Sequence, residues 1–284
     1  MMELDLKKVL QNLRIQAFHS SSNEALALLP DMLEHIGSTD AELRDDLIYS
    51  AFVNWIYDQR LLSAECMRAI VPIVLDEQHM FYRMGEKEGD GIFTRAFSVL
   101  LLPLLLGVHR DNPYLSLQEI EEVKTKLIRF LRQEQDKRDF VQNKGWAHAV
   151  AHAADAVDEL ALCIEMGKAD VFEILEVIRE VICDSSLVYT HGEEERLGTV
   201  VLSILQRGLL QPAAVCEWVN SFTAPVLAVQ NLPDKLLIRA NGRNFLQSLY
   251  FRLRWKDMLN PFESALEQTL RSISLETERL ENPG

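Results

Sequence analysis

Glycine and proline are scarce in this chain of 284 residues, which contains 12 glycines and 9 prolines. Both residue types interrupt regular secondary structure, so their scarcity favours long helices. Strict alternation of apolar and polar residues, the pattern of a half-buried strand, does not recur along the chain. The Asn-Gly pair at Asn241 and Gly242 is flanked by helical periodicity and does not indicate a hairpin. The sequence therefore predicts an all-α fold with no β-sheet.

Positive charge is also in short supply, because 29 Lys and Arg stand against 43 Asp and Glu, a formal net charge of -14. Phosphate backbones and anionic membrane surfaces are bound by clustered Lys and Arg. The balance thus argues against a nucleic-acid partner and against a membrane partner. The main local exception is the segment 239–256, where aromatic residues are mixed with Arg239, Arg243, Arg252 and Arg254. On so acidic a chain, we expect these arginines to pair with carboxylates.

Cysteine is rare, and the four cysteines at positions 66, 163, 183 and 216 form no Cys-x-x-Cys motif. Such scattered cysteines are typical of small buried residues in a reducing compartment. The first ten residues are charged and lack the apolar core of a signal peptide. The most apolar run, 96–108, is about 13 residues long, too short to span a bilayer. We therefore expect a cytoplasmic protein in which this run is a buried helix kinked by Pro103.

Signature motifs of the common enzyme classes are missing from the sequence. It has no phosphate-binding loop, no G-x-G-x-x-G, no nucleophile elbow and no H-E-x-x-H. What it does have is about a dozen helical segments joined by short links, as in proteins that stack helix pairs in series. We predict a single domain, 1–284, folded as a right-handed α-α superhelix of HEAT-like stacked helical hairpins.

Histidine recurs at a regular spacing in the stretch 144–159, KGWAHAVAHAADAVDE. Its alanines favour a helix, which we expect over 144–165, and Trp146 is expected to pack on the apolar side of that helix. Spacings of four, three and four residues then align a polar stripe of His148, His152, Asp155 and Glu159.

Three interpretations of this stripe remain open. The side chains of His148, His152 and Asp155 form a ligand set suited to zinc or non-haem iron. In that case Glu159 or Glu194 is the candidate general base of a metal-dependent hydrolase. Alternatively, the stripe lines a polar groove that binds a ligand without metal, or it is a solvated or structural face. A divalent metal is the one cofactor that the pattern suggests.

The link 134–144, EQDKRDFVQNK, is dense in both charges. It is either a solvated loop or an ion-pair network in which Asp136 and Arg138 hold the central helix, and we prefer the network. Arg95 lies near the start of an apolar helix, where the helix dipole disfavours a cation. We therefore expect Arg95 to pair with Asp90 or with a residue near Asp136.

Three segments of the chain, 90–102, 134–161 and 244–253, resemble a bacterial family known as domain of unknown function 2785. The most specific part is the pattern G-W-x-H-x-x-x-H-x-x-D at 145–155, and the resemblance covers most of the chain. It implies an all-helical fold similar to HEAT-type repeats in a bacterial cytosolic protein. The family supplies no accepted activity and no catalytic residues.

Together these features predict a binding or scaffold module with a polar groove, and a metal-dependent hydrolase is the alternative. The expected partner is a protein or a small-molecule ligand. Asn241 and Asn244, further along the chain, are additional candidates to face a groove. Besides Asn241, the candidate groove residues are Arg95, Asp136, Arg138, Trp146, His148, His152, Asp155, Glu159 and Asn244.

Overall fold

The computed structural model describes residues 1–274 and is mostly helical. The chain forms two compact units, one comprising Met1–Gly167 and the other beginning at Lys168. The prediction of a single domain stays a prediction.

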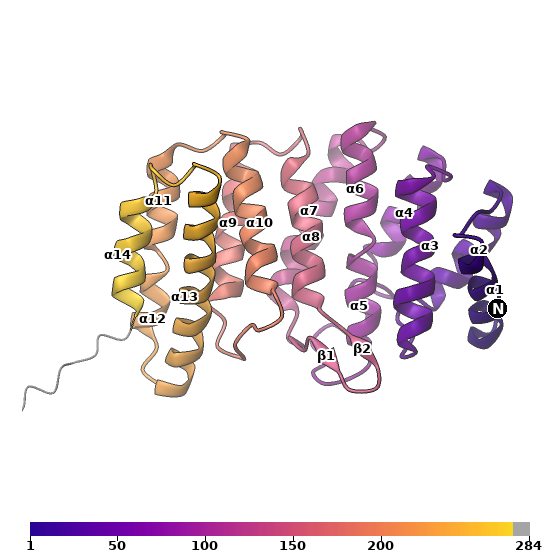
Figure 1. The fold of residues 1–284 in the computed structure, drawn as a ribbon, viewed down its shortest axis with the longest axis horizontal. Coiled ribbons are helices and arrows are strands. Elements are labelled where there is room, and N and C mark those ends of the chain that lie inside the picture. Colours follow the sequence, from indigo (N-terminus) through magenta and orange to yellow (C-terminus); the bar gives the residue numbers. More distant parts are fainter. Residues whose placement is uncertain (275–284) are drawn as a thin grey trace, which may run out of the picture. The chain divides into compact units, whose positions relative to one another are not determined.

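The first unit is built around α8, which packs against α5, α6 and α7 (Figure 1). Most of α8 is apolar, and its many alanines let the neighbouring helices approach closely. The elements in chain order are α1 (Glu3–Ile15), α2 (Ser22–Glu34), the π-helix η1 (Glu42–Tyr49), α3 (Ser50–Phe52), the π-helix η2 (Val53–Asp58), α4 (Ala64–Val74), α5 (Gly91–Val99), α6 (Leu102–Asp111), α7 (Leu117–Gln133), β1 (Phe140–Val141), β2 (Gly145–Trp146) and α8 (Ala149–Leu162).

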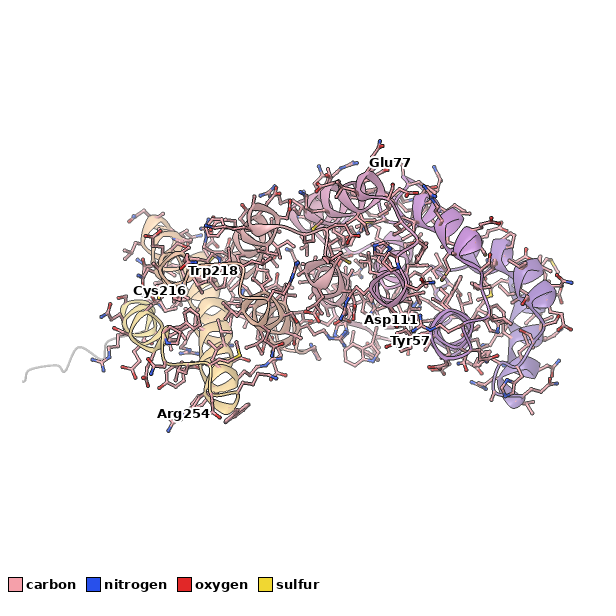
Figure 2. The ribbon with its side chains drawn as sticks, turned by 90° about the horizontal axis from the view of Figure 1, so that it is seen from above. Tyr57, Glu77, Asp111, Cys216, Trp218 and Arg254 are labelled. Atoms are coloured by element: carbon pink, nitrogen blue, oxygen red, sulfur yellow. The ribbon has the colours of Figure 1, made fainter. Side chains whose placement is uncertain are left out.

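The second unit is organised around its longest helix, α13, which packs against α9, α10, α12 and α14. In its core, Trp218 is 1% exposed and its indole N–H donates to the carbonyl of Leu175 at 2.7 Å. Figure 2 shows Trp218 enclosed among helices, whereas Arg254 projects from the end of α13. The elements are α9 (Lys168–Ile182), α10 (Glu193–Gln206), α11 (Pro212–Asn220), α12 (Thr223–Ala228), α13 (Leu232–Trp255) and α14 (Glu263–Ile273).

The apolar run is buried as predicted, but it forms two helices instead of one kinked helix. The chain turns at Leu100 and Leu101, and Pro103 lies in the first turn of α6, where its missing N–H costs nothing. By length and composition alone, the 21-residue stretch Gly91–Asp111 is long and apolar enough to cross a membrane. However, 89% of its most apolar window is buried within the protein, as in a core helix.

The prediction that the chain contains no β-sheet was wrong. Strands β1 and β2 form a two-stranded antiparallel sheet, with Phe140 opposite Trp146 and Val141 opposite Gly145. Gly145 has φ +80°, and a Cβ there would lie 2.9 Å from the Cβ of Ala41, so this position requires glycine. Two-residue strands are too short to show a period of two, which is why the pattern was missed.

Asn241 was expected to be a candidate to face a groove, and this was also wrong, because it is only 1% exposed. Its amide holds the loop that leads into α10. The Oδ1 atom accepts from the N–H of Tyr189 at 3.0 Å, and Nδ2 donates to the carbonyls of Leu187 at 2.9 Å and Asp184 at 3.3 Å. Asn244, one turn further along α13, is half-buried, and its side-chain amide makes no hydrogen bond within residues 1–274.

We therefore expect Asn241→Ala to lower the free energy of unfolding by about 2 kcal/mol or more, since it leaves three backbone groups of the loop without their partner. Asn244→Ala is the matched control, because it makes the same change of helix propensity on the same helix. We expect it to change stability by less than about 0.5 kcal/mol. Urea denaturation of both variants measures the difference, and equal losses would contradict the structural role of Asn241.

Candidate functional site

The central helix begins later than predicted. It was expected from residue 144, but α8 starts at Ala149, and His148 is its N-cap in the left-handed conformation, with φ 54° and ψ 34°. The backbone leaves strand β2 at Trp146 and must reverse direction before the helix can start. His148 therefore lies outside the helical stripe, which begins only at His152.

Four aromatic side chains of this region form a row that runs from the surface into the core. The rings of Phe140 and Trp146 meet edge to face with centroids 5.1 Å apart, and the Trp146 ring stacks on His148 at 4.4 Å. The row continues from His148 to His152 at 5.9 Å. Exposure falls along it from 56% and 39% for the first two side chains to 8% and 6% for the two histidines. The expectation that Trp146 packs on the apolar side of a helix was wrong.

The His152 ring contacts a backbone carbonyl and an aromatic ring of the core. Its Nδ1 lies 3.2 Å from the carbonyl oxygen of Ala96, which places a proton on Nδ1, and its ring meets Phe97 edge to face at 5.2 Å. The predicted ligand set of His148, His152 and Asp155 is not found among the groups in residues 1–274 whose ligand atoms all lie within 4.8 Å of one another. A carboxylate oxygen of Asp139 does lie within that distance of a His148 ring nitrogen.

The two carboxylates of the predicted stripe have different surroundings. Asp155 is half-buried on α8. Glu159, one turn further along, forms an ion pair with Arg110 of α6. A general base must have a free carboxylate oxygen directed at water or substrate, so this pairing does not favour the catalytic role considered for Glu159.

Arg44, on the π-helix η1, anchors the hairpin and is fully buried. Its Nη2 donates to the carbonyl of Lys144 at 2.8 Å and to that of Trp146 at 3.1 Å. Its Nη1 donates to the carbonyl of Ser38 at 2.6 Å. These bonds tie both ends of strand β2 to a helix about 100 residues earlier in the chain.

Arg44 makes no ion pair within the described part of the chain, although the nearby carboxylates of Asp45 and Asp40 favour its charged form. Its guanidinium lies over the rings of Phe93 and Phe97, 4.3 and 4.7 Å from their centroids. Burial lowers its pKa to about 10, which leaves it charged at neutral pH. No local sequence pattern connects Arg44 to the hairpin, so its role could not be predicted from the sequence.

Arg95 forms a fully buried pair with Glu134, which confirms the expectation of a partner near Asp136. Its Nε and Nη2 donate to the two carboxylate oxygens at 2.6 and 2.9 Å. Its Nη1 donates to the carbonyls of Tyr82 at 3.1 Å and Arg83 at 3.3 Å. The guanidinium thus joins α5, the loop before it and the end of α7.

The ion-pair network predicted for the charged link is also present. Arg138 pairs with Asp136 through Nε at 2.8 Å and Nη2 at 2.6 Å, and Nη2 also donates to the carbonyl of Gly89 at 2.6 Å. Asp136 in turn accepts from the N–H of Glu88 at 3.1 Å. The link that leads into the hairpin is therefore fixed to the loop before α5.

The structure thus brings six candidate residues of the first unit together in two clusters, and Asp155 and Glu159 belong to neither. Trp146, His148 and His152 belong to the aromatic row, and Arg95, Asp136 and Arg138 belong to the charged network beneath the hairpin. Strands β1 and β2 lie beside the lower ends of α5 and α8 in the view of Figure 1. Asn244 belongs to the second unit.

Comparison with known proteins gives one family match. A family model described as "Protein of unknown function (DUF2785)" matches residues 80–251. The match includes α5, the charged network, the hairpin and α8. Comparisons with curated proteins and with solved structures give no significant match.

We expect Arg95→Met to lower the free energy of unfolding by about 3–5 kcal/mol, because it leaves the buried Glu134 carboxylate without its counter-charge. The double variant Arg95→Met/Glu134→Met removes both charges and should recover more than half of that loss. Chemical denaturation of the single and double variants measures this coupling.

Arg138→Met is the control, because the Arg138 side chain is 29% exposed, whereas that of Arg95 is fully buried. Asp136 also keeps its bond from the N–H of Glu88, so this change should cost less. If Arg95→Met cost no more than Arg138→Met, or if the double variant were less stable than Arg95→Met, the central role of the buried pair would be contradicted.

Proposed function

The chain belongs to the DUF2785 family, and on the geometry of its first unit we propose that it is a binding module whose contact surface is the β1–β2 hairpin. We further propose that its helices stack as HEAT-like hairpins in a right-handed superhelix and that it works in the cytoplasm. Short links between many helices, and packing within each unit among helices that are near one another in chain order, support the first point. The acidic charge and scattered cysteines support the second.

The observation that carries this proposal is the aromatic pair of Phe140 and Trp146. Both side chains are substantially exposed although their rings contact each other. Aromatic residues are enriched in the centres of protein interfaces and among the residues that dominate binding energy. Burying each ring against a partner contributes about 1.5–3 kcal/mol, which is enough for a specific contact.

The hairpin holds these rings in a fixed arrangement before any partner binds. Arg44 bonds the backbone on both sides of Gly145, and the N–H of Ala147 donates to the carbonyl of Asp139 at 2.7 Å. The stacked His148 supports the Trp146 ring from the core side. A surface ordered in advance loses little conformational entropy on binding.

A protein partner fits this surface better than a small molecule does. The two aromatic rings form an apolar centre, and the ion pair of Lys144 with Asp90, at 2.6 Å and largely exposed, lies beside it. An apolar centre with a charged rim is the usual composition of a protein interface. We therefore propose that the partner presents an apolar side chain to the Phe140 and Trp146 rings.

The hydrolase alternative has less support. His152 is bonded to a backbone carbonyl and packed on Phe97, and Glu159 is paired with Arg110. Stoichiometric zinc, iron or manganese in the purified protein, lost on His148→Ala, would nevertheless favour it over the binding module.

The binding surface is tested with Phe140→Ala/Trp146→Ala. We expect this variant to fold with an unchanged circular dichroism spectrum and to bind the partner at least about tenfold more weakly, since interface aromatics of this kind dominate affinity. Affinity capture with quantitative mass spectrometry first identifies proteins retained by the wild type, and titration with the best of them then gives the dissociation constant.

The matched control is Ile15→Ala/Ile164→Ala, which truncates two side chains of the same unit that are 83% and 85% exposed. It should retain every partner. Equal recovery by the wild type and the aromatic double variant would refute the proposed surface.

A further inference from the structure

The second unit contains a groove between the first turns of α10 and the last turns of α13. Its volume is about 670 Å³, within the range of about 300–1,000 Å³ typical of small-molecule sites. Side chains from both helices line it, among them Arg196 and Thr199 of α10 and Phe251, Arg252 and Trp255 of α13.

Phe251 and Trp255 give the groove an aromatic wall. They lie one turn apart on α13, with ring centroids 6.2 Å apart and planes inclined by 30°. Their side chains are 49% and 75% exposed. A planar ring bound in the groove can therefore stack on the indole of Trp255 without displacing another part of the unit.

The groove is positively charged on a strongly acidic chain. Its lining contains three cations, Arg196, Arg252 and Lys256, and one carboxylate, Glu195, so its formal charge is 3 − 1 = +2 while that of the whole chain is -14. Lys256 is exposed and makes no ion pair within residues 1–274. Such a concentration of charge beside an aromatic wall matches an anion attached to a flat ring.

The orientation of Arg252 is fixed by α10. Its Nη2 donates to Oγ1 of Thr199 at 2.8 Å, and its Nη1 donates to the carbonyl of Glu195. Gly198 makes room for this contact, because a Cβ there would lie 3.1 Å from Nη1 of Arg252. The guanidinium is therefore positioned beside the aromatic wall before a ligand arrives.

From the groove's size, aromatic wall and charge, we propose that it binds a nucleoside monophosphate or a similar small aromatic phosphate ester. The base stacks on Trp255, and the phosphate is held by Arg196, Arg252 and Lys256. The net charge of the chain repels a long polyanion, which favours a small ligand over a nucleic-acid strand. The groove shares no residue with the hairpin surface, so either proposal can fail without the other.

Isothermal titration calorimetry of the full chain tests the ligand class. Adenosine monophosphate is the probe, and adenosine and inorganic phosphate are its two halves. We expect the monophosphate to bind at least about tenfold more tightly than either half, because it makes both the stacking and the charged contacts. A single-stranded oligonucleotide should bind no more tightly than the monophosphate.

Matched variants test the residues. Trp255→Ala should weaken binding of the monophosphate at least about tenfold, whereas Leu232→Ala, which truncates a 63% exposed side chain of the same helix outside the groove lining, should leave it unchanged. Lys256→Gln should weaken it about threefold or more and reduce its dependence on salt. Arg254→Gln, on the same turn of α13 but outside the groove lining, should have no effect.

The proposal is overturned if the monophosphate binds no better than its halves, or if Trp255→Ala binds it as the wild type does. Equal effects of Lys256→Gln and Arg254→Gln on binding would mean that the phosphate is attracted by the general positive charge of this region and not by a specific site. That result would also overturn the proposal. Much tighter binding of the oligonucleotide than of the monophosphate would also overturn the proposal, because it would identify a nucleic-acid strand as the ligand.

Discussion

The buried pair of Arg95 and Glu134 is the constraint on which the rest of the first unit depends. Both side chains are almost completely removed from water, which costs several kcal/mol per charge unless their hydrogen-bonding groups are satisfied. The pair meets this requirement with two bonds between its own atoms and further bonds to backbone carbonyls of the loop before α5. The pair thereby fixes the direction in which the chain leaves α7. That direction determines where the hairpin and α8 lie.

The sequence predicted the features that local patterns encode. Helical periodicity identified the helices, and the density of charge in 134–144 indicated a network. It did not predict the hairpin, because the backbone of β2 is held by Arg44, which lies about 100 residues earlier in the chain. It also did not predict the left-handed N-cap at His148. Residue spacing on an ideal helix predicts which side chains share a face, but it does not predict where tertiary contacts end that helix.

Helix α13 shows the same limit in the second unit. Asparagines, arginines and aromatics are distributed along its 24 residues. Asn241 is a buried loop anchor near the middle, whereas Phe251 and Trp255 are exposed near the end. Residue type alone suggested that Asn241 faces a groove, and its burial contradicts that expectation. Which neighbours cover each turn of a helix decides the role of its side chains, and that information is distributed over the whole unit.

The dependence of the hairpin on Arg44 also bears on the order in which this unit folds. Two strands of two residues each are not stable alone in water. The Arg44 guanidinium, which stabilises the two strands, can bond to them only after a loop of about 100 residues has closed. Because contacts of such high sequence separation are slow to form, we expect the helices to assemble first and the aromatic surface to be completed last. A partner that binds this surface would therefore distinguish the fully folded protein from a folding intermediate.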